Sequence, residues 1–271
     1  MAECNTCPSK DSCEKDDSTC MVTNNPLNNI KKVIGVMSGK GGVGKSTVAV
    51  LIAKQLKKQG FSVGIMDADI TGPSIPRLMG IKDEKAYGTE DLIYPVRTKE
   101  DIPVISLNSL MEDENQPVIW RGPIVGNMVK QFWNDVLWEN LDYLIIDMPP
   151  GTGDVALTVM QSIPMHGIVM VSVPQDMVAM IVSKAVHMVQ KMNIPVLGLI
   201  ENMSYIECPD CGKQIKWNED STAEYLAELE IDLLGELPMM PSINQLSRND
   251  VNEVEDRVQE MVKGIISKMN L

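Results

Sequence analysis

The stretch Val33-Ile-Gly-Val-Met-Ser38-Gly39-Lys40-Gly41-Gly42-Val43-Gly44-Lys45-Ser46 decides the fold of this 271-residue chain. Its first residues form an apolar run that predicts a buried strand ending near Ser38. The glycine-rich part then fits the pattern G-x-x-x-x-G-K-[ST] at every position. Apolar residues return at helical spacing after the loop, at Val48, Leu51, Ile52 and Leu56. A strand, a glycine loop and a helix in this order predict a phosphate-binding loop.

The residue types in this loop suit a nucleotide. Glycines allow consecutive N–H groups to face one concavity that holds phosphate oxygens, and the N-terminus of the following helix adds its dipole. We expect Lys45 to reach the β- and γ-phosphates and the Ser46 hydroxyl to ligate Mg²⁺. Lys40 has two interpretations: a solvated loop lysine, or a charge supplied in trans to a neighbouring subunit's nucleotide, as an arginine finger does.

Apolar runs and helix-period segments alternate along the rest of the chain. Strands are predicted at Val33–Ser38, Ser62–Met66, Pro103–Leu107, Tyr143–Asp147, Gly167–Val173, Val196–Ile200 and Leu233–Leu237. Helices are predicted near 124–140, 155–162, 176–192 and 221–229. Continuous apolar strands separated by helices indicate an α/β fold of three layers, with a mostly parallel sheet flanked by helices. The last helix, Val251 to Met269, has a mixed polar face, which favours packing against the domain over membrane binding.

Acidic residues follow two of the predicted strands. Asp67 and Asp69 end one strand, and Asp147 ends another. The carboxyl ends of parallel strands gather around the ligand crevice of such a fold. We therefore expect Asp147 to hold Mg²⁺ through water and Asp69 to orient the attacking water. The segment Met148-Pro-Pro-Gly-Thr-Gly-Asp154 carries glycine hinges, which indicate a sensor of the γ-phosphate.

Composition limits the partners. The formal net charge of −13, from 24 Lys+Arg against 37 Asp+Glu, argues against nucleic acid and anionic membranes, since both favour positive charge. No apolar run approaches the ~20 residues of a transmembrane helix, and the N-terminus lacks the pattern of a signal peptide. We expect a cytoplasmic protein whose six cysteines serve as metal ligands or redox thiols.

The first 28 residues differ in composition from the rest. They hold Cys4, Cys7, Cys13 and Cys20 among small polar residues, which predicts a flexible tail unless a metal organises it, with the domain at 29–271. These four thiols would suffice for a cluster or a zinc ion, although their spacing does not match the ferredoxin patterns.

A second cysteine motif, Cys208-Pro-Asp-Cys211, lies in a loop near 203–216. A tetrahedral zinc or an iron–sulfur cluster normally needs four protein ligands, and this motif supplies two. Two subunits related by a two-fold axis would bring two pairs together. A zinc site shared with tail cysteines, a thioredoxin-like redox pair and two idle thiols are the alternatives.

Several of these segments resemble one family. Lys40-Gly-Gly-Val-Gly-Lys45-Ser46-Thr47 resembles the deviant Walker A loop of the MinD/Mrp branch of P-loop ATPases. Further segments are similar to its Mrp/ApbC subgroup, the scaffold and carrier proteins for iron–sulfur clusters. They are Asp67–Pro76, Trp120–Pro123, Leu141–Asp154, and Glu201–Met203 with Cys208 and Cys211. The resemblance runs from about residue 30 to about residue 250.

This resemblance implies a homodimeric P-loop ATPase with slow ATP hydrolysis. It implies that ATP and Mg²⁺ bind at the loop, that Asn202 contacts the adenine and that Lys40 reaches the partner's phosphates. A [4Fe–4S] cluster would be bridged by Cys208 and Cys211 of both subunits and handed to apo-proteins, with neither nucleic acid nor membrane as a partner.

Three features depart from the family pattern. Proteins of the same fold with other activities suggest the alternative functions. The tail cysteines match only part of the pattern of the eukaryotic cytosolic relatives, Gly212–Trp217 replaces the usual Phe-Gly-x-Gly-Gly, and Thr71 stands where Tyr is frequent. The rivals are a positioning or regulatory ATPase of the MinD/ParA kind, an electron-transfer ATPase like nitrogenase iron protein, and a zinc-stapled ATPase module braced by Cys208 and Cys211.

Overall fold

A computed structural model describes residues 25–70, 72–89, 92–111, 122–174, 176–208, 210–216, 222–240, 243 and 256–271. Within these ranges an eight-stranded sheet has the order β12-β9-β8-β1-β7-β2-β6-β5. All neighbouring strands are parallel except β5 and β6, which are antiparallel. The strands are β1 (Asn29–Ser38), β2 (Val63–Asp67), β5 (Val96–Arg97), β6 (Pro103–Ile105), β7 (Asn140–Asp147), β8 (Gly167–Ser172), β9 (Val196–Glu201) and β12 (Leu233–Glu236).

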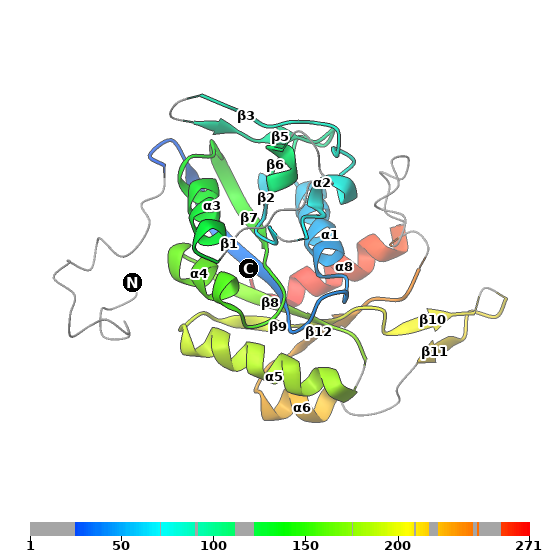
Figure 1. Ribbon diagram of the computed structural model, residues 1–271. Helices are drawn as coiled ribbons and strands as arrows, with labels where there is room; N and C mark the ends of the chain where they lie inside the picture. Colours follow the sequence, from blue (N-terminus) through cyan, green and yellow to red (C-terminus); the bar gives the residue numbers. More distant parts are fainter. Residues whose placement is uncertain are drawn as a thin grey trace, which may run out of the picture.

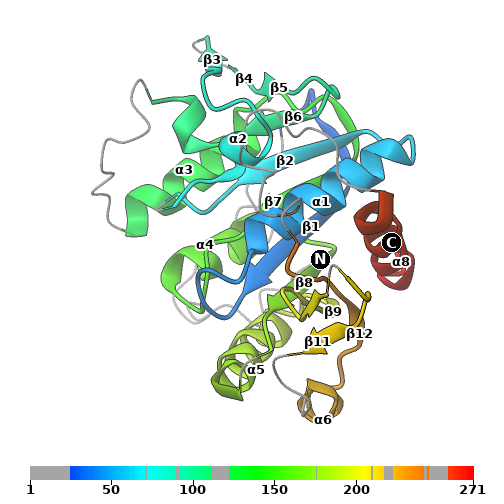
Figure 2. The same cartoon turned by 90° about the vertical axis from the view of Figure 1, so that its right-hand side faces the viewer.

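Helices cover both faces of this sheet (Figure 1). One face carries α1 (Lys45–Lys58), α2 (Ile75–Leu78) and α8 (Asp256–Lys268), whose buried apolar side chains form one core cluster with the strands. The other face carries α3 (Gly122–Asn134), α4 (Asp154–Ser162), α5 (Asp176–Lys191) and α6 (Thr222–Glu228), which form the second cluster. Figure 2 shows α1 and α8 on the opposite side of the sheet from α3, α4 and α5. The three-layer α/β prediction is therefore confirmed.

The strand before the phosphate loop lies at the centre of the molecule. Residues Val33–Ser38 of β1 are all buried, because β7 and β8 flank the strand and a core cluster covers each face. The apolar run that predicted this strand is thus continuous because both of its faces are covered. The central position places the end of β1, and the loop after it, between the ends of two neighbouring strands.

The last helix packs against the domain, as the sequence predicted. Val258, Val262, Ile265 and Ile266 of α8 are buried in the same core cluster as the apolar face of α1. The packing on β12 is close, since a Cβ added to Gly235 would lie 2.7 Å from Ile265 Cγ1. The predicted first residues of this helix, 251–255, lie outside the described residues.

The helix predicted near 124–140 was too long. The structure ends α3 at Asn134 and begins β7 at Asn140. Between them, the Asn28 side-chain oxygen accepts hydrogen bonds from the main-chain N–H groups of Trp138 (2.7 Å) and Glu139 (3.0 Å). This contact between distant parts of the chain holds the connection extended, so the helix stops although Val136 and Trp138 remain buried.

Short elements lie outside the predicted set. They are α2, β5, η4 (Leu107–Ser109), the hairpin of β3 (Tyr87–Gly88) with β4 (Ile93–Tyr94), and the hairpin of β10 (Tyr205–Glu207) with β11 (Gln214–Lys216). Among the described residues, no helix has the length and apolarity needed to cross a membrane. Several residues named from the sequence lie outside the described ranges: Cys4, Cys7, Cys13, Cys20, Thr71, Trp120, Arg121 and Trp217.

Candidate functional site

The glycine loop between β1 and α1 has the backbone that phosphate binding needs. Gly42 (φ 80°) and Gly44 (φ 81°) are both in the left-handed region, which only glycine adopts readily. Gly44 is the residue that caps α1, so the first N–H groups of the helix adjoin the loop. Left-handed residues in such a turn direct consecutive N–H groups to one side and form an anion nest.

The loop after β7, residues 148–153, lies against the glycine loop. The N–H of Gly151 donates a hydrogen bond of 2.8 Å to the carbonyl of Ser38, the last residue of β1. A Cβ on Gly151 would be 3.6 Å from the Gly39 carbonyl oxygen, so the two loops are in close contact. The segment predicted to sense the γ-phosphate is therefore positioned next to the phosphate loop.

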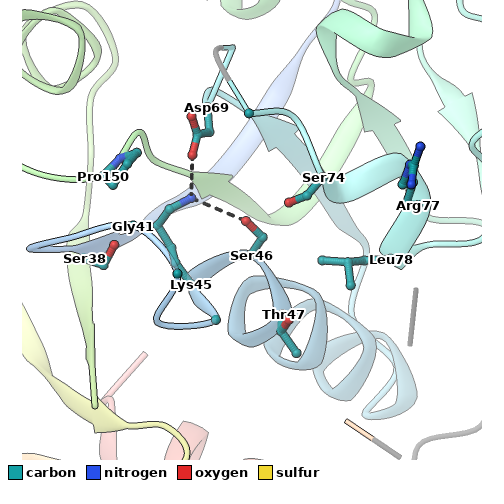
Figure 3. A pocket seen from close by; sticks show the side chains of 13 residues that line it. Ser38, Gly41, Lys45, Ser46, Thr47, Asp69, Ser74, Arg77, Leu78 and Pro150 are labelled. Atoms are coloured by element: carbon teal, nitrogen blue, oxygen red, sulfur yellow. Dashed lines mark hydrogen bonds and ion pairs between the residues drawn. The ribbon is translucent and has the colours of Figure 1, made fainter. Parts of the chain in front are cut away.

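A cavity of about 340 Å³ opens beside the loop (Figure 3). Its lining comes from the phosphate loop, the start of α1, the segment after β2 and the loop after β7. The lining residues are Ser38, Gly41, Gly42, Gly44, Lys45, Ser46, Thr47, Asp69, Gly72, Ser74, Arg77, Leu78 and Pro150.

Lys45 and Ser46 line this cavity, and both contact Asp147, which is fully buried behind them. Lys45 Nζ donates to Asp147 Oδ1 at 2.5 Å, and Ser46 Oγ donates to Asp147 Oδ2, also at 2.5 Å. Lys45 Nζ also lies 3.5 Å from Asp69 Oδ2, on the other wall (Figure 3). The structure thus brings together the cation and two carboxylates that the sequence named as phosphate-binding, metal-holding and water-orienting residues.

The donors around Ser46 suit Mg²⁺. The Ser46 hydroxyl and the Asp147 carboxylate are hard oxygen ligands of the kind that Mg²⁺ prefers. Ser46 lies nearer the cavity and Asp147 is fully buried behind it. Burial raises the pKa of Asp147, while Lys45 and Ser46 oppose that rise. An arriving cation would favour the ionised carboxylate for the same reason as Lys45 does.

Asp67 is the acidic residue to which the sequence assigned no role. It is fully buried and pairs in register with Asp147, since β2 and β7 are neighbours. Its carboxylate accepts hydrogen bonds from the N–H groups of Asp69 (3.2 Å) and Ile75 (3.3 Å) and from Ser106 Oγ (3.1 Å). Burial, with Asp147 adding repulsion, raises the pKa of Asp67 well above its usual range. Asp67 therefore organises the segment that carries Asp69.

Ser106 was not foreseen. It directly follows β6, a strand-end position equivalent to those of Asp67 and Asp147. That position is a signal the sequence contained, but serine at a strand end is too common a turn residue to identify a site.

Lys40 is half-buried, and its main-chain carbonyl accepts a hydrogen bond of 2.9 Å from Ser38 Oγ. Its action on a partner's nucleotide stays a prediction. Asn202 is 2% exposed and follows β9 directly. Its Nδ2 donates to the Val43 carbonyl of the phosphate loop at 2.9 Å. The predicted contact of Asn202 with adenine also stays a prediction.

Cys208 and Cys211 lie in the turn between β10 and β11, and residues 205–216 are called the cysteine hairpin below. Figure 1 shows this hairpin projecting from the body of the protein beyond β9. The turn closes through Cys208 N–H to the Lys213 carbonyl (3.0 Å) and Gly212 N–H to the Cys208 carbonyl (2.9 Å). Cys208 is half-buried, Cys211 is exposed, and both are free thiols.

The turn favours a thiolate at Cys208. Hydrogen bonds from the main-chain N–H groups of Cys211 and Asp210, together with the Cys211 thiol, lower the pKa of Cys208. The thiolate is the form that binds metals. Within the described ranges no group of three or more His, Cys, Asp or Glu side chains is arranged to hold a metal. The hairpin accordingly presents two thiols that could serve as metal ligands.

Comparison with known proteins places these features in context. The family described as NUBPL iron-transfer P-loop NTPase matches residues 29–270. A protein of Clostridium perfringens named iron-sulfur cluster carrier protein is 48% identical over 96% of both chains. One of Methanocaldococcus jannaschii with the same name is 39% identical over 98% of this chain and 96% of its own.

Two solved structures are similar to this chain. A nucleotide-binding protein from Archaeoglobus fulgidus, in complex with ADP, is 40% identical and has a TM-score of 0.72, with 83% of this chain and 90% of that chain covered. The cell division ATPase MinD of Pyrococcus furiosus, at 18% identity and a TM-score of 0.65, covers 89% of this chain and 98% of its own. That second likeness concerns the fold alone.

Proposed function

Since the chain belongs to the family of NUBPL iron-transfer P-loop NTPases, we propose that it is an ATP-dependent carrier of iron–sulfur clusters. It holds a [4Fe–4S] cluster at a homodimer interface and transfers it to apo-proteins. The membership confirms the resemblance drawn from the sequence. The cluster is the cargo of this protein, and slow ATP hydrolysis governs its binding or release.

The nucleotide half of the proposal rests on the cavity beside the phosphate loop. Gly39 to Thr47 cradle the phosphates, with Lys45 facing the β- and γ-phosphates and Ser46 and Asp147 facing Mg²⁺. Asp69 orients the attacking water, held in place by the hydrogen bond between its N–H and Asp67. Adenine nucleotide is supported as the ligand because a relative with 40% identity is known in complex with ADP.

The cargo half rests on one observation: the cysteine hairpin offers two thiols, and no third ligand group lies near them within the described part of the chain. A [4Fe–4S] cluster is held by four cysteine thiolates. Two hairpins from two copies of the chain supply four. Ligands shared between two protomers also link cluster affinity to association, so opening the interface weakens binding.

Anaerobic reconstitution with iron and sulfide tests the cargo half. Absorbance, iron and sulfide content and mass by light scattering are measured for the wild type, for Cys208→Ser and for a matched control in which the four tail cysteines are serines. We expect about one [4Fe–4S] cluster per two chains in the wild type and the control. We expect no cluster in Cys208→Ser.

The opposite pattern, with cluster lost from the tail control and kept in Cys208→Ser, would place the cargo site in the tail. Stoichiometric zinc in protein purified without oxygen, and no cluster after reconstitution, would favour the zinc-stapled module.

A further inference from the structure

We infer that Asn202 is a positioning residue that couples nucleotide occupancy of the phosphate loop to the cysteine hairpin. The inference rests on the proposed function for the two ligands, a nucleotide and a metal cluster. It adds the physical connection between their sites.

The connection begins at Val43, which lies between the left-handed residues Gly42 and Gly44. Its carbonyl accepts the hydrogen bond from Asn202 Nδ2 at 2.9 Å. In a trans peptide the carbonyl oxygen and the following N–H point in opposite directions. When the Gly44 N–H turns to a phosphate, the Val43 carbonyl therefore turns away from it, toward Asn202. A bound phosphate and Asn202 hold the two sides of one peptide group.

Close packing makes this contact sensitive to the loop. A Cβ added to Gly44 would overlap Asn202 Nδ2 and would lie 3.5 Å from Met203 Cε. Asn202 is 2% exposed, and no hydrogen-bond partner for its buried Oδ1 lies within the described residues. The loop cannot shift by much without displacing Asn202, because no solvent layer separates them.

Main-chain hydrogen bonds hold the short segment that joins Asn202 to the hairpin. The N–H of Asn202 donates to the Ser172 carbonyl (2.8 Å), and that of Ser204 donates to the Leu237 carbonyl (2.9 Å). Tyr205, the first residue of β10, accepts from the N–H of Met239 (2.9 Å). Asn202, Ser204 and Tyr205 are thus each held by a main-chain hydrogen bond, and Cys208 follows Asn202 by six residues.

Met203 is the one residue in this connection with a strained backbone. Its φ of 53° lies in the left-handed region, where a non-glycine residue stays only if its surroundings hold it. Its side chain lies against Gly44, so the same loop that holds Asn202 also holds Met203. A glycine at this position would adopt the same φ without strain, and it would make the backbone between Asn202 and the hairpin more flexible.

Hydrogen exchange followed by mass spectrometry tests the coupling without any cluster. The full chain, reduced and free of iron and zinc, is compared with and without saturating MgADP. In the wild type we expect slower exchange in peptides covering residues 39–47 and also in peptides covering 203–216. The slowing in the hairpin should be about fivefold, which corresponds to one added hydrogen bond of ~1 kcal/mol.

Two variants separate coupling from nucleotide binding. Because Asn202 is also the predicted adenine contact, Asn202→Ala is measured at an MgADP concentration raised until the phosphate loop is protected as in the wild type. Under that condition the hairpin should no longer be protected. In Met203→Gly, Asn202 is intact and the same loss of hairpin protection is expected. Asn140→Ala, at the far end of β7, removes an exposed asparagine side chain. It should behave as the wild type.

A wild-type hairpin that MgADP leaves unchanged, although the loop is protected, overturns the coupling and leaves the proposed function standing. Hairpin protection that persists in both Asn202→Ala and Met203→Gly overturns it as well. A wild type in which MgADP protects neither segment overturns the nucleotide half of the proposed function together with the coupling.

Discussion

Asp67 and Asp147 are register partners at the ends of two adjacent parallel strands, and both carboxyl groups are fully buried. One cation, Lys45, lies 2.5 Å from Asp147 Oδ1 and 3.5 Å from Asp69 Oδ2. Three carboxyl groups, those of Asp67, Asp69 and Asp147, thus gather around one ammonium group. A bound Mg²⁺ would add positive charge beside these carboxyl groups and favour their ionised forms.

Removing Lys45 should destabilise the protein. Lys45→Ala leaves buried carboxylates without their cation, and breaking a buried ion pair from one side costs about 3 kcal/mol. Protonation of the carboxylates at low pH would remove part of this penalty. The decrease in the free energy of unfolding should therefore be larger near pH 8 than near pH 5. Urea denaturation at both pH values measures it.

The control is Lys54→Ala, which breaks an ion pair with the half-exposed Glu100. This substitution should lower the free energy of unfolding by less than ~1 kcal/mol. Equal losses in Lys45→Ala and Lys54→Ala would mean that the buried pair of Lys45 with Asp147 stabilises the fold no more than the more exposed pair of Lys54 with Glu100.

Asp67 should make stability fall as pH rises. Its folded pKa is raised, so the unfolded chain releases the proton first and binds fewer protons than the folded chain between the two pKa values. The free energy of unfolding then decreases as pH rises from about 4, the ordinary pKa, toward the raised value. In Asp67→Asn this contribution is absent, so the curve of unfolding free energy against pH should be flatter. Parallel curves for the two proteins would show that the Asp67 carboxyl is not perturbed.

Lys40 should act on the neighbouring subunit. Lys40→Ala is expected to keep ADP affinity within about twofold of the wild type and to lower ATP turnover by at least about tenfold, as loss of an arginine finger does. Isothermal titration and phosphate release give the two values.

Mixing two inactive variants tests the in-trans role. Lys45→Ala lacks the lysine proposed to bind the phosphates but keeps Lys40. In a mixed dimer it would offer Lys40 to the nucleotide bound by the Lys40→Ala partner, so turnover should return on mixing. A mixture as inactive as its components would show that Lys40 acts within its own chain.

Cys208 should react as an activated thiol in the metal-free protein. The hydrogen bonds of the turn lower its pKa, so the thiolate persists at lower pH than in an ordinary cysteine. A chain with Cys211→Ser and serines at the four tail positions isolates Cys208. Its rate of alkylation by iodoacetamide should have a midpoint below about pH 8.5, the usual thiol value. A midpoint at that value or above would mean that the turn does not stabilise the thiolate.

The long elements were predictable from the sequence because their signal is local. Val33–Ser38 is a continuous apolar run, and the structure buries all six residues. The contacts of Lys45 and Ser46 with Asp147 were also within reach. Strand ends in a parallel sheet meet at one edge, and the phosphate loop lies at that edge.

What the sequence did not reveal depends on contacts between distant residues. The end of α3 is set by Asn28, which is 110 positions away from Trp138. The contact of Asn202 with Val43 spans 159 positions, and neither residue type signals it. Strands of two residues, such as β3 and β4, are too short for any periodicity to appear.

The cysteine hairpin is fixed at its base and carries its sulfur atoms at the opposite tip. A small rotation at the base would therefore displace the sulfur atoms by a larger distance than the base itself. Three residues of a strand span about 10 Å, and a tilt of about 10° at the base would move the tip by about 2 Å. A metal–thiolate bond is ~2.3 Å long. If the proposed cluster binds at this tip, angular changes too small to disturb the sheet would thus suffice to break a metal–thiolate bond.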